Sequence, residues 1–392
     1  MGEVLVALIG VMLVGLCALL AVWYVQDMLA VLRAPALGTL PAPPADGPLV
    51  SVIIPARDEA ARIGGCLAGL AAQTYRRFEV LVVDDHSSDG TAEVARGYAA
   101  SLPELRVLEG APLPPGWAGK CWACWQAAGQ ARGELLLFLD ADVKPRPGLL
   151  AAMGARAEGG RIDLLTLVPL IELGSLAERL VLPAFSALLA AVYPFARVNN
   201  PHAPEFFAIG QCIMMRRAAY DSVGGHRAVR GSVLEDMDLA RLVKRGGMCL
   251  EALVAPDLIV VRMYTGWRDL AEGLRKNAVA GFRSGGPRAA WVGVRLMLMA
   301  VLPLDLLAAG AGLTAARSGG WLGPALLAAG ALLLAVSWLC WGVAVRHRHR
   351  IGAAWGALLP LGAAAYFWLA ATALVRLKSG RGVRWKGRVF TR

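Results

Sequence analysis

Two pairs of carboxylates each stand at the end of an apolar run. Asp84 and Asp85 end "FEVLVVDD", and Asp140 and Asp142 end "LLLFLDAD". The D-x-D spacing puts two carboxylates on the same side of an extended chain. Such a pair can hold Mg²⁺ or Mn²⁺ while the remaining positions of the ion bind diphosphate oxygens. The pattern therefore predicts a site for a divalent metal and a phosphate-bearing ligand, with satisfied caps as the alternative.

A lysine and two cysteines lie together in "PPGWAGKCWACW". Lys120 follows a turn-rich loop and begins a predicted helix, where its ammonium group and the helix N-terminal N–H groups can reach a diphosphate. A solvated lysine is the alternative. Cys121 and Cys124 form a C-x-x-C, but no second pair stands at zinc-binding spacing. We interpret both cysteines as small buried hydrophobic residues in a helix that packs on a sheet.

Alternating strands and helices must position these groups. Apolar runs predict strands at residues 49–56, 78–85, 105–110 and 134–142, and helical patterns follow at 58–73, 87–100 and 119–131. This alternation is typical of a parallel α/β sheet. Ligands of such sheets bind outside the carboxyl ends of the strands, where both carboxylate pairs fall.

The composition also indicates membrane-spanning segments. The 392 residues are 57% hydrophobic and only 18% charged, which is too apolar for an ordinary soluble domain. A helix of about 20 apolar residues can cross a bilayer. Runs of that length occupy residues 4–25, 291–316, 321–345 and 351–375. We interpret the first as an uncleaved anchor, because it is longer than a usual signal-peptide core and no basic segment precedes it.

The net charge and the cysteines exclude other classes of protein. Much of the charge of +11 lies near the C-terminal apolar runs, where it suits anionic lipid headgroups better than nucleic acid. Nucleic-acid binding would be indicated by a basic stripe with interleaved aromatic residues, and the sequence contains no such stripe. The seven scattered cysteines do not form a disulfide framework and fit a reducing compartment.

A domain organisation follows from these patterns. The prediction is an anchor at 1–30, a Pro/Ala/Gly-rich linker at 31–48, an α/β domain at 49–265, an amphipathic interfacial helix at 266–285, transmembrane helices at 291–376 and a basic tail at 377–392. One stretch inside the α/β domain is unusually apolar. Residues 176–198 are short for a span and are predicted to lie in the interface or to enter the membrane partway, with a buried core helix as the alternative.

Four stretches cover most of residues 49–256 and occur in a characteristic order. They read "SVIIPARDEAARIGGCLAGLAAQTY", "VLVVDDHSSDGTAEVA", "LLLFLDAD" and "GGHRAVRGSVLEDMDLARLVKRGG". In this order they resemble the family 2 glycosyltransferases of the GT-A fold. "PLPPGWAGKCWACWQAA" and the closing "VRWKGRVF" resemble a membrane-bound subgroup associated with carotenoid and hopanoid pathways. The resemblance implies an α/β, Rossmann-like GT-A catalytic domain with a mainly parallel sheet, plus N-terminal and C-terminal transmembrane helices.

The resemblance also implies roles for individual residues. The nucleotide-sugar donor would contact Pro55, Ala56, Glu59, Asp84, Asp85, Lys120 and Asp140. Asp142, with Asp140, would hold Mg²⁺ or Mn²⁺. Asp236, beside Glu235, would be the general base of catalysis, and Gln211 and His226 would lie on the acceptor side.

The chemistry agrees with these roles, although structural alternatives remain. Inverting sugar transfer needs a carboxylate to take the proton of the acceptor hydroxyl, and the diphosphate leaving group needs a metal and cations. Taken alone, Glu235 and Asp236 would be helix N-terminal acids that complement the helix dipole. A lone histidine such as His226 is more often structural.

The predicted function is the transfer of a single sugar from a nucleotide sugar to a lipid or isoprenoid acceptor. The Q-x-x-R-W signature of processive synthases is missing after the predicted base, so chain synthesis is disfavoured. Transfer to polyprenyl phosphate and polysaccharide synthesis remain the alternatives among enzymes. A non-enzymatic membrane transporter or scaffold is disfavoured, because Asp305 is the only acid in the late apolar runs. Protein partners are unknown from the sequence.

The predicted location is the cell membrane, with the catalytic domain facing the cytoplasm. An N-terminus outside puts this domain inside, where nucleotide sugars are. Three late spans would then put the basic tail outside, whereas basic segments favour the inside. The sequence therefore predicts that one apolar segment does not cross fully or that residues near Phe185 dip into the membrane.

Overall fold

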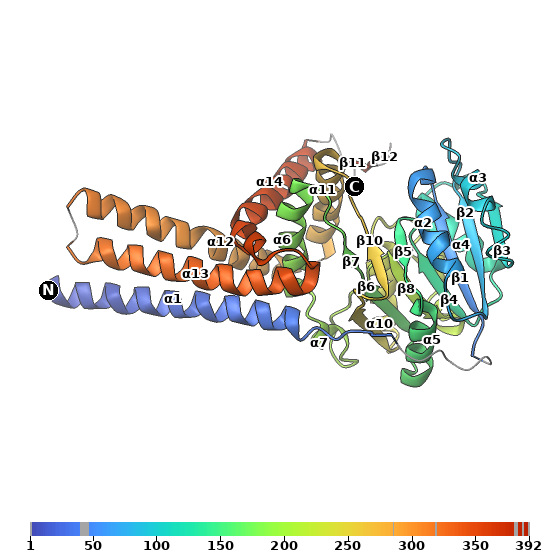
Figure 1. Ribbon diagram of the computed structural model, residues 1–392, viewed down its shortest axis with the longest axis horizontal. Helices are drawn as coiled ribbons and strands as arrows, with labels where there is room; N and C mark the ends of the chain where they lie inside the picture. Colours follow the sequence, from blue (N-terminus) through green and yellow to red (C-terminus); the bar gives the residue numbers. More distant parts are fainter. Residues whose placement is uncertain are drawn as a thin grey trace. The chain divides into compact units, whose positions relative to one another are not determined.

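The computed structural model describes residues 2–39, 47–284, 286–317, 320–379, 383–385 and 388–390. The chain divides into two compact units (Figure 1). The sheet unit comprises Ala34–Glu172 and Tyr193–Met263. The helical unit comprises Met1–Arg33, Leu173–Val192 and Tyr264–Arg392.

A seven-stranded sheet forms the centre of the sheet unit. In spatial order its strands are β3 (Leu105–Glu109), β2 (Phe78–Asp84), β1 (Val50–Ala56), β4 (Leu135–Leu139), β8 (Cys212–Arg216), β6 (Leu164–Val168) and β9 (Leu250–Val254). The pairs β3–β2, β2–β1, β1–β4 and β6–β9 are parallel, and β8 runs antiparallel to β4 and β6. All five residues of β4 are buried, as expected of a strand covered on both faces. The predicted mainly parallel α/β sheet is confirmed.

Helices cover this sheet. They are α2 (Ala60–Ala71), α3 (Thr91–Arg96), α4 (Gly119–Gln130), α5 (Leu149–Gly160), α7 (Phe195–Val198), α8 (Arg217–Ser222), α9 (Gly225–Ala228) and α10 (Glu235–Arg245). The first three correspond to the helical patterns predicted from the sequence. A second sheet of β5 (Val143–Pro145), β10 (Ile259–Val261) and β7 (Leu170–Ile171) begins directly after Asp142. The D-x-D turn, residues 140–142, therefore connects the last residue of β4 in the seven-stranded sheet to β5 in the second sheet.

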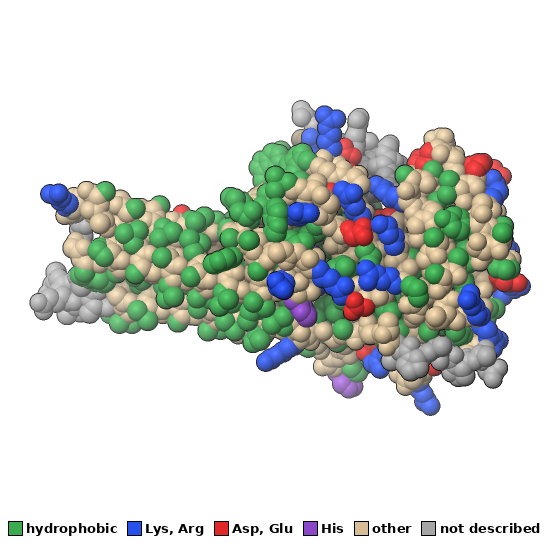
Figure 2. Space-filling view, viewed as in Figure 1, with side chains coloured by type: hydrophobic (Ala, Val, Ile, Leu, Met, Phe, Trp, Pro, Cys, Tyr) green, Lys and Arg blue, Asp and Glu red, His purple; other side chains and the backbone are tan. Residues whose placement is uncertain are grey.

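The helical unit contains α1 (Gly2–Leu32), α6 (Leu176–Val192), α11 (Trp267–Ser284), α12 (Gly286–Ala315), α13 (Leu322–His349), the short 3₁₀ helix η1 (Ala353–Leu358) and α14 (Leu359–Lys378). Among the described residues, five helical segments are long and apolar enough to cross a membrane: Leu8–Leu32, Leu176–Val198, Gly286–Ala315, Leu322–His349 and Ala353–Leu377. Figure 2 shows hydrophobic side chains over much of the surface of this unit, and Val11, Met12 and Val14 of α1 are each more than 70% exposed. Such a surface indicates association with a membrane.

The domain boundaries differ from the sequence prediction at α6. The prediction places all of residues 49–265 in the α/β domain, but α6 groups with the apolar helices of the helical unit. It packs against α14, where the Phe185 and Tyr366 ring centroids lie 5.5 Å apart. Apolar surface that α6 would otherwise expose is covered by this contact.

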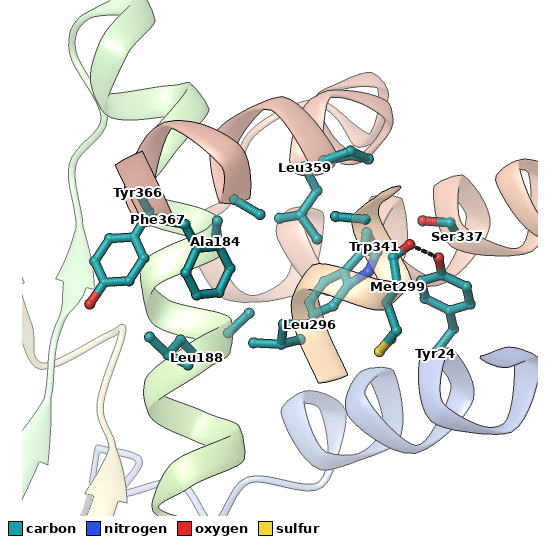
Figure 3. Close-up of a pocket in the computed structure, with 14 residues that line it drawn as sticks. Tyr24, Ala184, Leu188, Leu296, Met299, Ser337, Trp341, Leu359, Tyr366 and Phe367 are labelled. Carbon is teal, nitrogen blue, oxygen red and sulfur yellow. Dashed lines mark hydrogen bonds between the residues drawn. The ribbon is translucent and has the colours of Figure 1, made fainter. Parts of the chain in front are cut away.

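Helix α1 is held against α12 by polar contacts inside the apolar unit. Asp27 and Arg295 form an ion pair at 2.6 Å, and the Arg295 guanidinium lies 5.8 Å from the centre of the Trp23 ring. The Tyr24 hydroxyl donates to the backbone oxygen of Met299. Tyr24 and Met299 line a cavity of about 20 Å³ between the helices (Figure 3).

Helix α11 corresponds to the predicted amphipathic segment at 266–285. Its Trp267 ring stacks with Trp368 of α14, with ring centroids 6.5 Å apart. The predicted basic tail at 377–392 is described at β11 (Val383–Trp385) and β12 (Arg388–Phe390), which pair as a hairpin. The rest of "VRWKGRVF" and linker residues 40–46 lie outside the described residues.

The contact between α6 and α14 depends on a glycine. A Cβ atom on Gly362 would overlap the Leu180 carbonyl oxygen, so Gly362→Ala should force the helices apart. Overpacking of this kind costs about 1–3 kcal/mol of folding free energy. We expect a lower unfolding temperature for the detergent-solubilised protein, measured by tryptophan fluorescence.

Gly312→Ala is the matched control, because nothing lies within 4 Å of the added Cβ in helix α12. Alanine favours a helix over glycine by about 1 kcal/mol, so this variant should be as stable as the parent or slightly more so. Equal losses in the two variants would contradict the close packing of α6 on α14.

Candidate active site

The predicted carboxylates lie at one edge of the seven-stranded sheet. Strands β2 and β4 flank β1, and all three run in parallel. Asp84 ends β2, and Asp140 directly follows β4. Two strand spacings of about 4.8 Å separate β2 from β4, so the strand ends that carry the two carboxylate pairs lie about 10 Å apart at the same edge of the sheet.

The residues predicted to bind the nucleotide lie together around the ends of β1 and β2. Ala56 pairs with Asp84 across the two strands, and the Asp85 N–H donates to the Ala56 oxygen at 2.8 Å. The Glu59 N–H donates to the Thr91 hydroxyl at 2.8 Å, which connects the loop after β1 to the start of α3. These contacts bring Pro55, Ala56, Glu59, Asp84 and Asp85 to one place.

A buried oxygen of Asp84 points to a ligand at this place. Among the described residues, Asp84 Oδ1 is buried and has no hydrogen-bond partner. Burying a carboxylate oxygen without a partner is costly. A nucleotide donor group at the end of β2 would satisfy it.

Lys120 joins the two halves of the site. Its ammonium nitrogen lies 2.7 Å from Asp140 Oδ1 and 2.8 Å from Glu235 Oε1, and it donates to the Gly210 oxygen at 3.4 Å. The lysine is the second residue of α4, and Glu235 is the first residue of α10. One side chain therefore connects the end of β4 with the loop before β8 and the beginning of α10. The predicted alternative of a solvated lysine does not describe this contact.

The carboxylate of Asp236 is also fixed by its surroundings. Its Oδ2 accepts the Gly210 N–H at 2.7 Å, and its Oδ1 accepts the Met237 N–H at 2.8 Å. Both bonds orient the carboxylate within the first turn of α10. These two bonds leave other lone pairs of the carboxylate available, so Asp236 can accept a proton or a further hydrogen bond.

Electrostatics give the two acids at the start of α10 different properties. Burial, and then the negative charge of Glu235, raise the pKa of Asp236 to about 7. Burial opposes the ionisation of Glu235, but the Lys120 ammonium outweighs it and lowers the pKa of Glu235. Burial likewise opposes the charge on Lys120, while Asp140 and Glu235 raise its pKa well above the usual value. Near neutral pH the site therefore holds an ionised Glu235 beside an Asp236 that can exchange a proton.

Gly210 is a site residue that the sequence did not single out. A Cβ atom here would lie 2.8 Å from Lys120 Nζ, 3.2 Å from Glu235 Oε1 and 3.3 Å from Asp236 Oδ2. Only glycine lets the backbone approach all three charged groups. Its position directly before Gln211, in "FFAIGQ", was the signal that could have identified it.

The two residues predicted on the acceptor side differ in their surroundings. The Gln211 backbone oxygen accepts the Asp140 N–H at 3.2 Å, and its side-chain Oε1 is buried with no hydrogen-bond partner in the part of the chain that the structure describes. His226 lies in the core, 2% exposed. Its Nδ1 is 3.0 Å from the Tyr220 hydroxyl, and burial lowers its pKa to about 4. The ring of His226 is thus neutral near pH 7 and packs in the core beside Tyr220.

The C-x-x-C cysteines are buried, as interpreted from the sequence. Cys121 and Cys124 are both 0% exposed and free. Burial raises the pKa of each thiol, which makes a reactive thiolate unfavourable. The Cys121 thiol lies 3.5 Å from the Val229 oxygen and so contacts the loop that precedes α10.

The donor chemistry of the D-x-D residues fits a hard divalent cation. Asp140 and Asp142 supply carboxylate oxygens, which Mg²⁺ and Mn²⁺ prefer. The described residues contain no cluster of three or more His, Cys, Asp or Glu side chains that could hold a metal. A cation bound here would therefore take its other ligands from the diphosphate of a donor and from water.

A family model matches the part of the chain that carries most of this site. Residues 51–224 match the model described as Glycosyl transferase family 2. The match begins in β1 and includes both carboxylate pairs and Lys120. This part of the chain is therefore similar to family 2 glycosyltransferase domains, and the resemblance noted in the sequence is confirmed.

Individual relatives agree with this family. The 4,4'-diaponeurosporenoate glycosyltransferase of Staphylococcus haemolyticus is 27% identical over 241 residues, which cover 61% of this chain and 63% of the relative. Glycosyltransferase AglE of Haloferax volcanii is 37% identical over 119 residues, which cover 30% of this chain and 38% of the relative. In both cases the match spans less than two thirds of the relative's length.

A solved structure confirms the fold. The mannosyltransferase PcManGT from Pyrobaculum calidifontis, solved in complex with GDP-Man and Mn²⁺, aligns over 93% of this chain and 97% of its own, with a TM-score of 0.50 and 22% identity. The predicted GT-A, Rossmann-like fold with additional apolar helices is thus confirmed. The family match supports a glycosyltransferase enzyme.

The raised pKa of Asp236 predicts an effect on stability. Between the ordinary value of 3.8 and about 7, the folded state keeps the proton of Asp236 and the unfolded state loses it. Stability therefore falls as the pH rises through this range. Asp236→Asn should unfold several degrees higher than the parent at pH 8, and the difference should shrink toward pH 4.5.

Glu235→Gln is the matched opposite. The pKa of Glu235 is lowered in the folded state, so its charge stabilises the fold above its unfolded pKa, and this variant should unfold at a lower temperature at pH 8. Thermal unfolding of both detergent-solubilised variants at several pH values tests the pair. Shifts of the same sign at pH 8 would contradict the electrostatic assignment.

Proposed function

We propose that this chain, which is similar to family 2 glycosyltransferases, transfers a single sugar from a nucleotide sugar to a lipid or isoprenoid acceptor with inversion at the anomeric carbon. The observation that carries the proposal is the contact of Lys120 with both Asp140 and Glu235. It brings the donor-side carboxylates and the acids of α10 into one site. A site for sugar transfer needs these two sets of groups within reach of the same bond.

In this proposal Asp236 is the general base. The acceptor hydroxyl gives its proton to Asp236 as its oxygen attacks the anomeric carbon, and the nucleoside diphosphate leaves from the opposite face. A base works best when its pKa lies near the working pH, and the pKa of Asp236 is about 7. Glu235 supports this role, because its negative charge raises the pKa of Asp236.

Lys120 and the D-x-D residues stabilise the leaving group. The diphosphate gains negative charge as the bond to the sugar breaks, and a preorganised ammonium group lowers the energy of that state. Asp140 and Asp142 would hold a divalent cation, which supplies further positive charge to the diphosphate oxygens when bound. The Mn²⁺ in the structure of PcManGT supports this choice of metal.

A lipophilic acceptor is supported by two observations. The described part of the chain contains five helices apolar and long enough to cross a membrane. The Staphylococcus relatives are named for 4,4'-diaponeurosporenoate, in line with the carotenoid-associated subgroup that the sequence resembles. Pro55, Ala56, Glu59, Asp84 and Asp85 would bind the nucleotide, and Gln211 would face the acceptor.

We further propose that the sheet unit faces the cytoplasm and that α1, α12 and α13 cross the membrane. Helix α6 leaves the sheet unit after β7 and returns to it before β8, which pairs with β4 and β6. A single folded domain lies on one side of the membrane, so α6 begins and ends on the same side. Its packing partner α14 then also remains on that side.

This topology agrees with the distribution of basic residues. Three crossings, with the N-terminus outside, put the sheet unit, Arg346–Arg350 at the end of α13 and the tail at 377–392 on the inner side. Basic segments next to membrane helices prefer the cytoplasm. The conflict seen in the sequence disappears when α14 does not cross.

A transfer assay tests the enzyme. Membranes that contain the protein are incubated with labelled UDP-sugars or GDP-sugars, and label is counted in the organic-soluble lipids. We expect label with one class of donor, a loss on addition of EDTA, and a loss of about a hundredfold or more in Asp236→Asn. Donor binding should persist in Asp236→Asn. No lipid label from any donor with a folded protein would sink the proposal.

Reporter fusions test the topology. Green fluorescent protein fluoresces only in the cytoplasm, and alkaline phosphatase is active only outside it. Fused after Arg392, the fluorescent protein should be bright and the phosphatase inactive. Fused after Arg317, between α12 and α13, the results should be reversed. An active phosphatase after Arg392 would show that α14 crosses.

A further inference from the structure

An open hollow of about 870 Å³ lies on the sheet unit beside α10. Its walls come from the loop before α10, from α9 and from α10 itself. It is lined by Gly224, Arg227, Ala228, Val229, Arg230, Gly231, Ser232, Asp238, Arg241 and Leu242. We call this site the arginine hollow, because three guanidinium groups surround it against a single carboxylate.

Two of the three arginines have no anionic partner of their own. Arg227 and Arg230 are exposed, and in the described part of the chain their side chains form no hydrogen bond or ion pair. An isolated surface arginine needs no explanation. Two unpaired guanidinium groups that line one concavity with a third arginine make a positive potential that draws anions.

The third arginine is held in place by an ion pair. Arg241 Nη2 lies 2.7 Å from Asp238 Oδ1, and the other oxygen of Asp238 accepts the Ser232 hydroxyl at 2.6 Å. Arg241 Nε is buried without a hydrogen-bond partner among the described residues. A donor that is fixed, desolvated and unsatisfied is suited to an acceptor oxygen from outside.

The hollow is distinct from the catalytic edge but connected to it. Residues two apart on a helix point about 200° apart, so Asp238 faces the hollow while Asp236 bonds to Gly210. The loop between α9 and α10 contacts the residue that precedes α4. In this contact the Ala118 N–H donates to the Arg230 oxygen at 2.6 Å. An occupant of the hollow would therefore contact the loop between α9 and α10. This loop leads into α10, which carries Asp236, and it bonds to the start of α4, which carries Lys120.

We propose that the arginine hollow binds the phosphate group of a lipid. Guanidinium groups match the oxygens of phosphate in a two-pronged geometry. A phosphate monoester carries about −1.5 to −2 charges near neutral pH, which complements three arginines and one carboxylate better than the single charge of a carboxylic acid. That the phosphate belongs to the sugar acceptor rests on the proposed function; the binding itself does not.

Size also favours this site over the cavity in the helical unit. That cavity holds about 20 Å³, which is enough for about one water molecule. The arginine hollow is large enough for a phosphate and the first atoms attached to it. The hydrocarbon part of the lipid would lie outside the hollow.

Binding of farnesyl phosphate by the full chain in neutral detergent tests the proposal, with farnesol as the uncharged counterpart of the same chain length. We expect farnesyl phosphate to bind at least about tenfold more tightly than farnesol. Arg227→Gln/Arg230→Gln should remove that preference. The control Arg76→Gln/Arg77→Gln makes the same change in charge at two exposed arginines of the same unit and should keep it.

The outcomes separate the proposal from its rivals. Unchanged preference in Arg227→Gln/Arg230→Gln, or an equal loss in both double variants, would overturn the hollow as the phosphate site.

Where only Arg227→Gln/Arg230→Gln loses the preference for farnesyl phosphate, a competition experiment identifies the kind of phosphate that the hollow binds. Displacement by phosphatidylglycerol indicates a membrane headgroup, displacement by inorganic phosphate alone indicates recognition of the free anion, and displacement by neither indicates the acceptor lipid. Absent sugar transfer with intact binding would sink the proposed function and leave this site standing.

Discussion

The ammonium group of Lys120 is the point on which the arrangement of the site depends. It lies between Asp140 and Glu235, with Asp236 directly following. Without a cation, these carboxylates would repel one another at short range in a partly buried setting. Burial raises the pKa of Asp236, and the charge of Glu235, which Lys120 keeps ionised, raises it further. One lysine thus holds the segments together and makes neighbouring acids chemically different.

The sheet topology brings the partners of Lys120 to it. Strand β8 runs antiparallel to β4, so the chain that enters β8 passes the carboxyl end of β4. Gly210 and Gln211 lie at this entry, and their backbone bonds to Asp236 and Asp140. A side chain at position 210 would meet three charged groups at once, so the close approach of the backbone to these groups requires a glycine.

Local patterns predicted the parallel strands and the carboxylates at their ends, because apolar runs and strand termini are local features. They did not predict what lies far apart in the chain but close in space. Lys120 was assigned to a diphosphate, whereas the structure also gives it two carboxylate partners. Gly210 carried no residue-type signal of its own. The apolar pattern of α6 predicted an interfacial segment inside the α/β domain, but its grouping with the helical unit follows from packing on α14, which no local pattern contains.

The interruption of the sheet unit by α6 connects the candidate site to the apolar helices through the chain itself. The segment Leu173–Val192 separates β7 from β8 in sequence, and the residues just before β8 hold Asp236 and Asp140. The Glu178 carboxylate at the start of α6 accepts N–H bonds from Gly174 and Gly266, so both chain entries into the helical unit meet at one acid. The loop that carries Gly210 and Gln211 therefore lies between α6 and β8 in the chain, after the short helix α7.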